Sequence, residues 1–331
     1  MKLQQLRFLL AVVQHDCNVT AAAETLHTSQ PGVSKQLRLL EQELGLELFV
    51  RAGRRFRALT PAGERIVEHA RRAVIETERI RSLAAELRGD SSGTLALATT
   101  QTQARYVLPP ILRAFRERFD SVDVQLHQGT TEQSAAMMRE RQVDFAIVSG
   151  TTQPVPEARA LPLYRWDRVI VVPRNHPLAA GGERPSLPAL ARYPLVTYLF
   201  SDRPDSSLMQ TFASHGLKPR IAFTARDADV IKTYVRNGLG VGVLASMAID
   251  DHSDGDLAVL EAPGLFPRLT TWIVFPRSPV LRRFHAEFLR LLAPHLPESS
   301  VRALMDADAG GDTSLPGAGD VPLLGRAQRC S

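Results

Sequence analysis

The feature that most constrains this chain is the stretch 19–44, which has the pattern of two short helices joined by a tight turn. The small residues at 21–23 allow a second helix to cross the first closely after His27 and Thr28. Ser29 is a suitable N-cap for the second helix, and Pro31 fits its first turn, where the amide that proline lacks has no helical partner. Because Gly45 suits the helix end, the pattern predicts a helix-turn-helix.

The second helix has two chemically different faces. At about 100° per residue, its apolar positions fall within one narrow sector: Val33, Leu37, Leu40 and Leu44. The opposite side holds hydroxyl, amide and cationic groups: Ser34, Lys35, Arg38 and Gln42. Such groups hydrogen-bond base edges and phosphates when a helix enters the major groove of DNA. We therefore expect a DNA-recognition helix; the alternative is an amphipathic helix whose charged face is only solvated.

The next segment predicts a basic hairpin. Phe49, Phe56 and Leu59 alternate with arginine around a turn at 52–53, and the hairpin holds four such residues: Arg51, Arg54, Arg55 and Arg57. A hairpin of this kind lies along the phosphate backbone or in the minor groove, whereas the alternative is a basic surface loop. The full set of predicted DNA contacts is Ser29, Gln30, Pro31, Ser34, Lys35, Arg38, Arg51, Arg54 and Arg55.

A long helix is predicted over 61–88, with Thr60 as its N-cap and Pro61 in the first helical position. Apolar and small residues recur in it at alternating spacings of four and three: Ile66, Ala70, Ala73, Thr77, Ile80, Ala84 and Leu87. This is a weak coiled-coil seam, and it favours a dimer. A symmetric dimer would place two recognition helices on successive half-sites of a duplex. The alternative is a single helix packed on its own domain.

The charge of the chain favours a polyanionic partner. The 331 residues have a formal net charge of +5, and residues 1–72 hold eleven Lys or Arg against seven Asp or Glu. Most of the positive surplus therefore lies with the helix-turn-helix. We expect no membrane association and a cytoplasmic protein, because polar residues interrupt the N-terminal apolar run and no other run is long enough to span a bilayer. Two cysteines, Cys17 and Cys330, make no disulfide framework and leave a redox sensor as a minor alternative.

After a linker at 89–93, strands and helices alternate. Strands are predicted at 94–99, 122–127, 144–148, 169–172, 195–198, 220–224, 241–244 and 270–274. Helices are predicted at 104–118, 131–141, 188–193, 208–215, 228–237 and 281–292. This order implies parallel sheets covered by helices, in two lobes whose cleft closes on a small molecule. The domain boundaries are 1–60, 61–88, 94–162 with 267–295 (lobe I), 163–266 (lobe II), and a disordered tail at 299–331.

These segments together resemble a known family. SQPGVSKQLRLLEQELGLELFVR followed by LTPAG is similar to the winged helix-turn-helix of LysR-type transcriptional regulators, and ATTQTQARYVLP, DFAIVSG and FTARDADVIKTYV resemble the CysB-type branch. The resemblance implies an α/β protein: a winged helix-turn-helix, a linker helix and a two-lobed effector domain like a periplasmic binding protein. It further implies a homodimer or homotetramer that binds double-stranded promoter DNA, contacts RNA polymerase, and activates sulfate-assimilation and cysteine-biosynthesis genes in response to an acylated serine, sulfate or thiosulfate.

The residues of ATTQTQ support an anion site, because hydroxyls, an amide and free helix amides converge where a strand ends and a helix begins. The alternative is ordinary N-capping without a ligand. By resemblance, Thr100, Thr102 and Gln103 match anion-contacting positions of the branch, Ser149 stands where the branch has Thr, and Trp166 matches in place. Segment 199–205 departs from the branch pattern. There Arg203 would reinforce anion binding or pair locally with Asp202 and Asp205.

Nothing in the sequence favours catalysis. The histidines lack metal-ligand spacing, and the glycine run at 238–242 precedes a strand instead of opening a helix, which a dinucleotide site requires. We expect no enzyme activity and no cofactor. Two further functions stay open: a ligand-binding module whose N-terminal part contacts only proteins, and a LysR-type regulator of another pathway with a different effector.

Overall fold

The computed structural model describes residues 1–53, 55–88, 92–152, 155, 158–180, 184–276, 281–297, 301, 317 and 319–325. The chain forms two compact units, the first made mainly of residues 1–90 and the second of most of the remainder. Each unit is described by itself.

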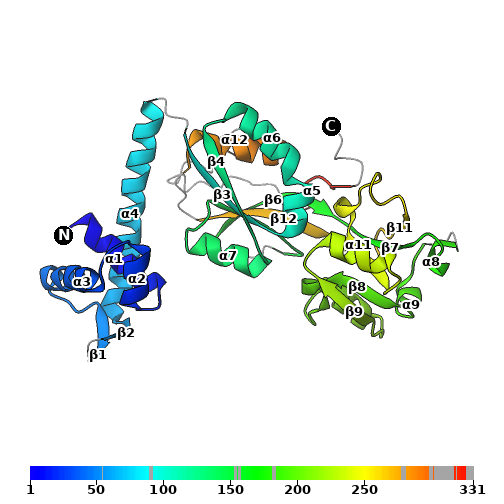
Figure 1. Ribbon diagram of the computed structural model, residues 1–331, viewed down its shortest axis with the longest axis horizontal. Helices are drawn as coiled ribbons and strands as arrows, with labels where there is room; N and C mark the ends of the chain where they lie inside the picture. The colour runs from blue at the N-terminus through cyan, green and yellow to red at the C-terminus, as the bar shows by residue number, and fades with distance from the viewer. Residues whose placement is uncertain are drawn as a thin grey trace. The chain divides into compact units, whose positions relative to one another are not determined.

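The first unit contains the predicted helix-turn-helix (Figure 1). Its helices are α1 (Leu3–Gln14), α2 (Val19–Thr25), α3 (Gln30–Leu44) and α4 (Pro61–Leu87). The Ser29 side chain caps α3 by accepting from the Gly32 amide, and Gly45 ends the helix with a φ of 66°. The turn after α2 has His27 in the left-handed region, with a φ of 50°. The capping residues expected from the sequence therefore set both ends of α3.

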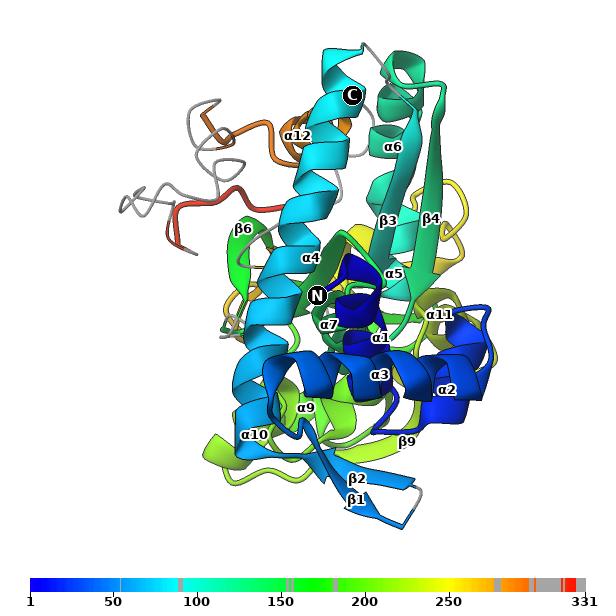
Figure 2. The same cartoon turned by 90° about the vertical axis from the view of Figure 1, so that its left-hand side faces the viewer.

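An apolar cluster holds these helices together. The predicted inner stripe of α3 is fully buried at Val33, Leu37 and Leu40, and Ala22 of α2 is also fully buried. Strands β1 (Phe49–Ala52) and β2 (Arg55–Leu59) form an antiparallel hairpin, whose arms extend beyond the helices in Figure 2. The ring of Phe49 stacks on that of Phe56 at a centroid distance of 4.3 Å. This stack fixes the hairpin to the cluster.

Lobe I of the second unit is a five-stranded sheet in the order β4-β3-β5-β12-β6. The strands are β3 (Gly93–Thr99), β4 (Val122–Gln128), β5 (Phe145–Gly150), β6 (Arg159–Trp166) and β12 (Leu269–Phe275). Helices α6 (Leu108–Arg118) and α12 (Arg283–Leu292) cover one face, and α7 (Thr131–Arg139) covers the other (Figure 1). Rings of Phe115, Phe145 and Phe288 pack beneath α6 and α12.

Lobe II has a second five-stranded sheet in the order β11-β7-β10-β8-β9. Its strands are β7 (Arg168–Pro173), β8 (Pro194–Tyr198), β9 (Arg220–Ala225), β10 (Val241–Ala245) and β11 (Leu257–Glu261). Its helices are α8 (Pro177–Ala180), α9 (Leu187–Leu190), α10 (Ser207–Ser214) and α11 (Ala228–Arg236), with short 3₁₀ turns η1 (Leu199–Asp202) and η2 (Ser246–Ala248). The central strands β7, β8 and β10 are almost continuously apolar and buried, as strands covered on both faces require, whereas the edge strands β9 and β11 are partly exposed.

The structure corrects the sequence prediction in several places. The sheets are mixed, because β12 runs antiparallel to β5 and β6, and β7 runs antiparallel to β10 and β11. The helix predicted over 104–118 is two helices, α5 (Gln101–Tyr106) and α6, which separate at Val107 just before two prolines. Strand β6, which the sequence analysis missed, continues to Trp166. The chain therefore crosses between the lobes at Asp167, not at the predicted boundary at 163.

The last described segment contradicts the predicted disorder of 299–331 for residues 321–324. The Arg165 amide donates to the Pro322 carbonyl at 2.8 Å, and the Leu324 amide donates to the Arg165 carbonyl at 2.7 Å. Val321 is 2% exposed, and Leu323 forms a parallel bridge with Arg165. The segment is therefore paired beside the end of β6, where the chain leaves lobe I.

Candidate DNA-binding surface and effector cleft

The outer face of α3 is accessible, as a recognition helix requires. Lys35 and Arg38 are exposed and Ser34 is half-buried, while the Gln30 side chain donates to Ser34 Oγ at 3.2 Å. Ser29 and Pro31 at the helix start are also exposed. The structure thus places the six predicted α3 contacts at one end and along one side of the helix.

The hairpin arginines differ in their surroundings. Arg51 pairs with Glu41, a buried carboxylate that also accepts from the Leu48 amide at 2.9 Å, and its guanidinium lies 5.0 Å from the centroid of the Phe56 ring. Arg51 is therefore part of the contact that joins the hairpin to α3, a role that sequence reasoning missed. Arg57 is exposed on β2. Arg54 and the side chain of Arg55 lie outside the described residues.

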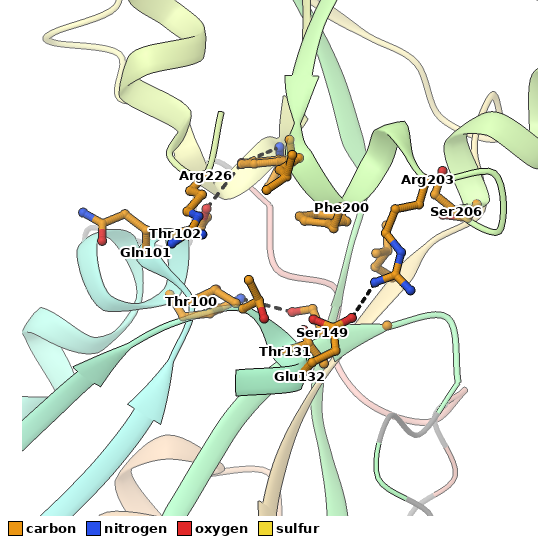
Figure 3. Close-up of a pocket in the computed structure, with 18 of the residues that line it drawn as sticks. Thr100, Gln101, Thr102, Thr131, Glu132, Ser149, Phe200, Arg203, Ser206 and Arg226 are labelled. Atoms are coloured by element: carbon orange, nitrogen blue, oxygen red, sulfur yellow. Dashed lines mark hydrogen bonds and ion pairs between the residues drawn. The ribbon is translucent and has the colours of Figure 1, made fainter. Parts of the chain in front are cut away.

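The two lobes enclose a cavity of about 750 Å³. From lobe I it is lined by hydroxyl and amide side chains at the carboxyl ends of β3, β4 and β5: Thr100, Thr102, Gln103, Thr130, Thr131 and Ser149. Figure 3 shows Thr100, Thr131 and Ser149 facing Phe200, Arg203 and Ser206 of lobe II. All six predicted effector contacts line this cavity, including Trp166 and Arg203.

A buried network under the cavity holds several of these side chains. Thr271 Oγ1 accepts from Gln103 Nε2 and from Trp166 Nε1, both at 3.2 Å, and lies 3.0 Å from Ser149 Oγ. The Gln103 carbonyl oxygen accepts from the Tyr164 hydroxyl, whose pKa is raised by burial. Since Gln103 is 2% exposed and bonded at both ends, its main effect in this state is to orient Ser149 and Thr271.

Thr100 and Thr102 have different roles at the start of α5. Thr100 is the N-cap, but its side chain makes no capping hydrogen bond. The residue is half-buried and lines the cavity. The Thr102 hydroxyl donates to Tyr198 of lobe II at 3.4 Å, and Tyr198 accepts from the Ala245 amide. Thr102 therefore links the lobes.

Sequence reasoning missed Thr130 and Thr131. The Thr130 hydroxyl accepts from the Gln133 backbone amide at 3.2 Å, and the Thr130 backbone amide donates to the Gln133 side-chain oxygen at 2.9 Å, which makes a capping box at the start of α7. The signal was present in the sequence, because a Thr three residues before Gln follows β4 at the same sheet edge as Thr100.

Arg203 joins the two lobes at the mouth of the cavity. Its guanidinium lies 2.6 Å from Glu132 of α7 (Figure 3). It also lies 3.4 Å from Asp205. The Glu132 pKa is lowered: burial acts to raise it, but hydrogen bonds from its own backbone amide, Thr130 and Arg203 together outweigh burial. Of the two sequence-based expectations, local pairing with Asp205 is observed, and the pairing with Glu132 was not anticipated.

A second contact between the lobes is centred on Lys232 of α11, which is 1% exposed. Its ammonium lies 2.8 Å from Asp254 and donates to the Tyr106 hydroxyl of α5 at 3.0 Å. Burial acts to lower the Lys232 pKa, but the hydrogen bonds with Asp254 and Tyr106 raise it overall. This charged cluster holds α5 against lobe II, and it thereby positions Thr100 in the wall of the cavity.

Family models match almost the whole described chain. Residues 3–64 match the bacterial regulatory helix-turn-helix protein of the lysR family, and residues 88–297 match the LysR substrate binding domain. The chain belongs to the LysR family. This LysR-type protein is thus a DNA-binding transcriptional regulator with the winged and effector domains that the sequence predicted.

Two transcriptional regulators are similar in sequence to this chain over nearly its full length. The LysR-type chain is 43% identical to the HTH-type transcriptional regulator CysB of Haemophilus influenzae, covering 91% of this chain and 93% of that protein. It is 38% identical to the HTH-type transcriptional regulator SsuR of Burkholderia cenocepacia, covering 92% and 99%. These relatives are transcriptional regulators, which agrees with the expectation that the chain is not an enzyme.

Solved structures share the fold. The cofactor-binding domain of the Cbl transcriptional regulator is 36% identical with a TM-score of 0.61 and covers 66% of this chain and 95% of that domain. Full-length CbnR in complex with target DNA is 24% identical with a TM-score of 0.53, covering 89% and 100%, and shows the fold alone.

Among the described helices, none combines the length and hydropathy needed to cross a bilayer.

Burial and the neighbouring Asp16 raise the pKa of the Cys17 thiol. A raised pKa leaves less of the reactive thiolate, which argues against the minor alternative of a redox sensor at this position.

Proposed function

We propose that this LysR-type regulator activates sulfate-assimilation and cysteine-biosynthesis genes, and that an acylated serine or a sulfur oxyanion in the cleft controls it. The proposal depends on one observation in the cleft. Hydroxyl groups cluster at the carboxyl ends of β3, β4 and β5 and offer hydrogen-bond donors to oxygen-rich anions. The identities of 37–43% to CysB, Cbl and SsuR proteins support the same assignment.

The mechanism we infer is a population shift between arrangements of the lobes. Thr102–Tyr198 and Arg203–Glu132 are the contacts that a ligand in the cleft would strengthen or replace, because each joins one lobe to the other. A ligand that binds one arrangement more tightly favours it, which would change the placement of paired recognition helices and the bend of promoter DNA. We further propose a cytoplasmic homodimer or homotetramer that contacts RNA polymerase.

The second candidate is a LysR-type regulator of another pathway. The observation that favours it is the segment 199–205, where Arg203 occupies the cavity mouth and pairs with Glu132. This ion pair sets the charge and the space at the cavity entrance in a segment that departs from the CysB-type pattern. It therefore favours an effector whose shape differs from that of an acylated serine or a sulfur oxyanion.

Thermal-shift titration of the full-length protein separates the two. O-acetylserine, N-acetylserine, sulfate and thiosulfate are compared with aromatic carboxylates. The first candidate predicts that at least one sulfur-pathway compound raises the melting temperature and changes the gel shift on the promoter fragments of sulfur genes. A response to aromatic acids alone would favour the second.

The double variant Thr100→Val, Ser149→Ala locates the ligand. This variant should need at least a tenfold higher ligand concentration to give the same rise in melting temperature. It should retain salt-dependent DNA binding. Thr94→Val, an exposed change at the other end of β3, is the matched control. If the double variant responds like the control, the ligand binds elsewhere.

A further inference from the structure

A buried guanidinium without a carboxylate partner lies in the lobe II wall of the cleft. Arg168, the first residue of β7, lines the cavity and is 3% exposed. It donates to Ser207 Oγ at 3.0 Å and to the Pro267 carbonyl at 3.5 Å. Both acceptors are neutral, and within the described ranges no carboxylate forms an ion pair with it. Arg168 was not among the effector contacts predicted from the sequence.

The surroundings make this positive charge unfavourable. Burial lowers the pKa of Arg168 to about 10, because desolvation penalises the charged form. Ser207 is the first residue of α10, an eight-residue helix capped by Ser206, and the helix N-terminus adds partial positive charge beside the guanidinium. The Phe266 ring, 5.9 Å from the guanidinium carbon, is the one aromatic contact that offsets part of this charge in the described structure.

The carboxylates of the cavity wall are occupied elsewhere. Glu132 and Asp205 both pair with Arg203. Asp227 caps α11 by accepting from the amides of residues 229 and 230. The charge of Arg168 is therefore left for a group that enters the cavity.

We propose that Arg168 and the N-terminus of α10 form an anion-binding position on lobe II, which takes the carboxylate or sulfur oxyanion group of the effector. The hydroxyls of lobe I then take the other polar atoms of the ligand, so that one molecule holds both lobes. The chemical class of this ligand rests on the proposed function; the anion-binding position does not.

The first test uses inorganic sulfate, because it requires no assumption about the natural effector. Full-length wild type, Arg168→Met and Arg168→Lys are melted in zwitterionic buffer with sodium sulfate, against sodium chloride at equal ionic strength. Sulfate should stabilise wild type and, more weakly, Arg168→Lys, but not Arg168→Met. Without sulfate, Arg168→Met should melt at or above the wild-type temperature, an outcome that a purely structural arginine would not give.

The second test asks which ligand group binds there. N-acetylserine and its methyl ester are titrated calorimetrically into the same proteins. The Kd of the acid should be at least tenfold higher for Arg168→Met than for wild type. The ester should bind weakly, and equally, to wild type and Arg168→Met. If Arg168→Met does not fold, Arg168→Lys still tests the position, with a several-fold rise in Kd for the acid.

The possible failures are distinct. An equal sulfate response in wild type and variants, or no response to any anion in wild type, would overturn the anion-binding position. Sulfate stabilisation that depends on Arg168, without any binding of acylated serines, would uphold the position and remove acylated serine from the proposed function.

Discussion

Lys232 shows how one residue fixes the cleft. Its ammonium is buried against Asp254, and Arg236 lies 2.8 Å from the other oxygen of the same carboxylate. Lys232→Met leaves Asp254 buried with a single cation at its side, so we expect a loss of about 3 kcal/mol in unfolding free energy. Urea denaturation measures it. The double variant Lys232→Met, Asp254→Leu should be more stable than the single variant, because it removes both charges; equal or lower stability would refute this account.

Single side chains also separate base recognition from phosphate contact. Arg38 is exposed on the recognition face of α3, and Arg57 is exposed on the hairpin. Arg38→Ala should weaken binding to the operator by about 1 to 3 kcal/mol and reduce discrimination against random duplex, because base contacts specify sequence. Arg57→Ala should weaken both duplexes alike and lower the salt slope by about one. Fluorescence anisotropy at several salt concentrations measures both, and identical behaviour of the two variants would show that the faces are wrongly assigned.

At the scale of elements, α4 has an apolar stripe that the described residues of its own unit leave exposed. Ile80 is 66% exposed, Leu83 57% and Leu87 81%. We expect a second copy of α4 to cover Ile80 and Leu87, which belong to the predicted seam. Ile80→Asp should shift the protein towards monomer in light scattering and raise the dimer Kd at least tenfold, because a charge at a seam position would be buried. Arg71→Asp, exposed on the same helix, is the control and should leave the oligomer unchanged.

The sequence predicted elements well where local chemistry decides them. Capping residues and the apolar stripe placed α3 correctly, and short apolar runs placed most strands. The prediction failed where tertiary pairing decides. Strand β6 was missed because Pro162 interrupts it, yet it pairs with β12 along its whole length around a register shift. Strand β11 was missed as well. Strand direction was also wrong for β7 and β12, since local order along the chain does not reveal between which strands a returning strand lies. Arg168 was missed because only the fold shows that its neighbours are neutral.

For the whole molecule, a buried carboxylate of lobe II makes stability depend on pH. Asp254 has a lowered pKa: burial acts to raise it, but hydrogen bonds from Lys232, the Asp250 backbone and Arg236 outweigh burial. A carboxyl with a lowered pKa in the folded state contributes stability above its unfolded value of 3.8, and this contribution is lost as pH falls through the lower folded value. The melting temperature should therefore fall below about pH 4. Asp254→Asn should flatten that part of the profile, and an unchanged profile would exclude Asp254 as its source.

The pairing of residues 321–324 beside Arg165 has a practical consequence. The Leu324 carbonyl also accepts from Ser246, so this stretch contacts both lobes beside the chain crossing. A shortened gene that removes residues 321–324, or a purification tag or fluorescent fusion placed directly after them, would therefore disturb a segment that contacts both lobes. Reporter strains built with such fusions should be compared with untagged protein before their dose–response curves are interpreted.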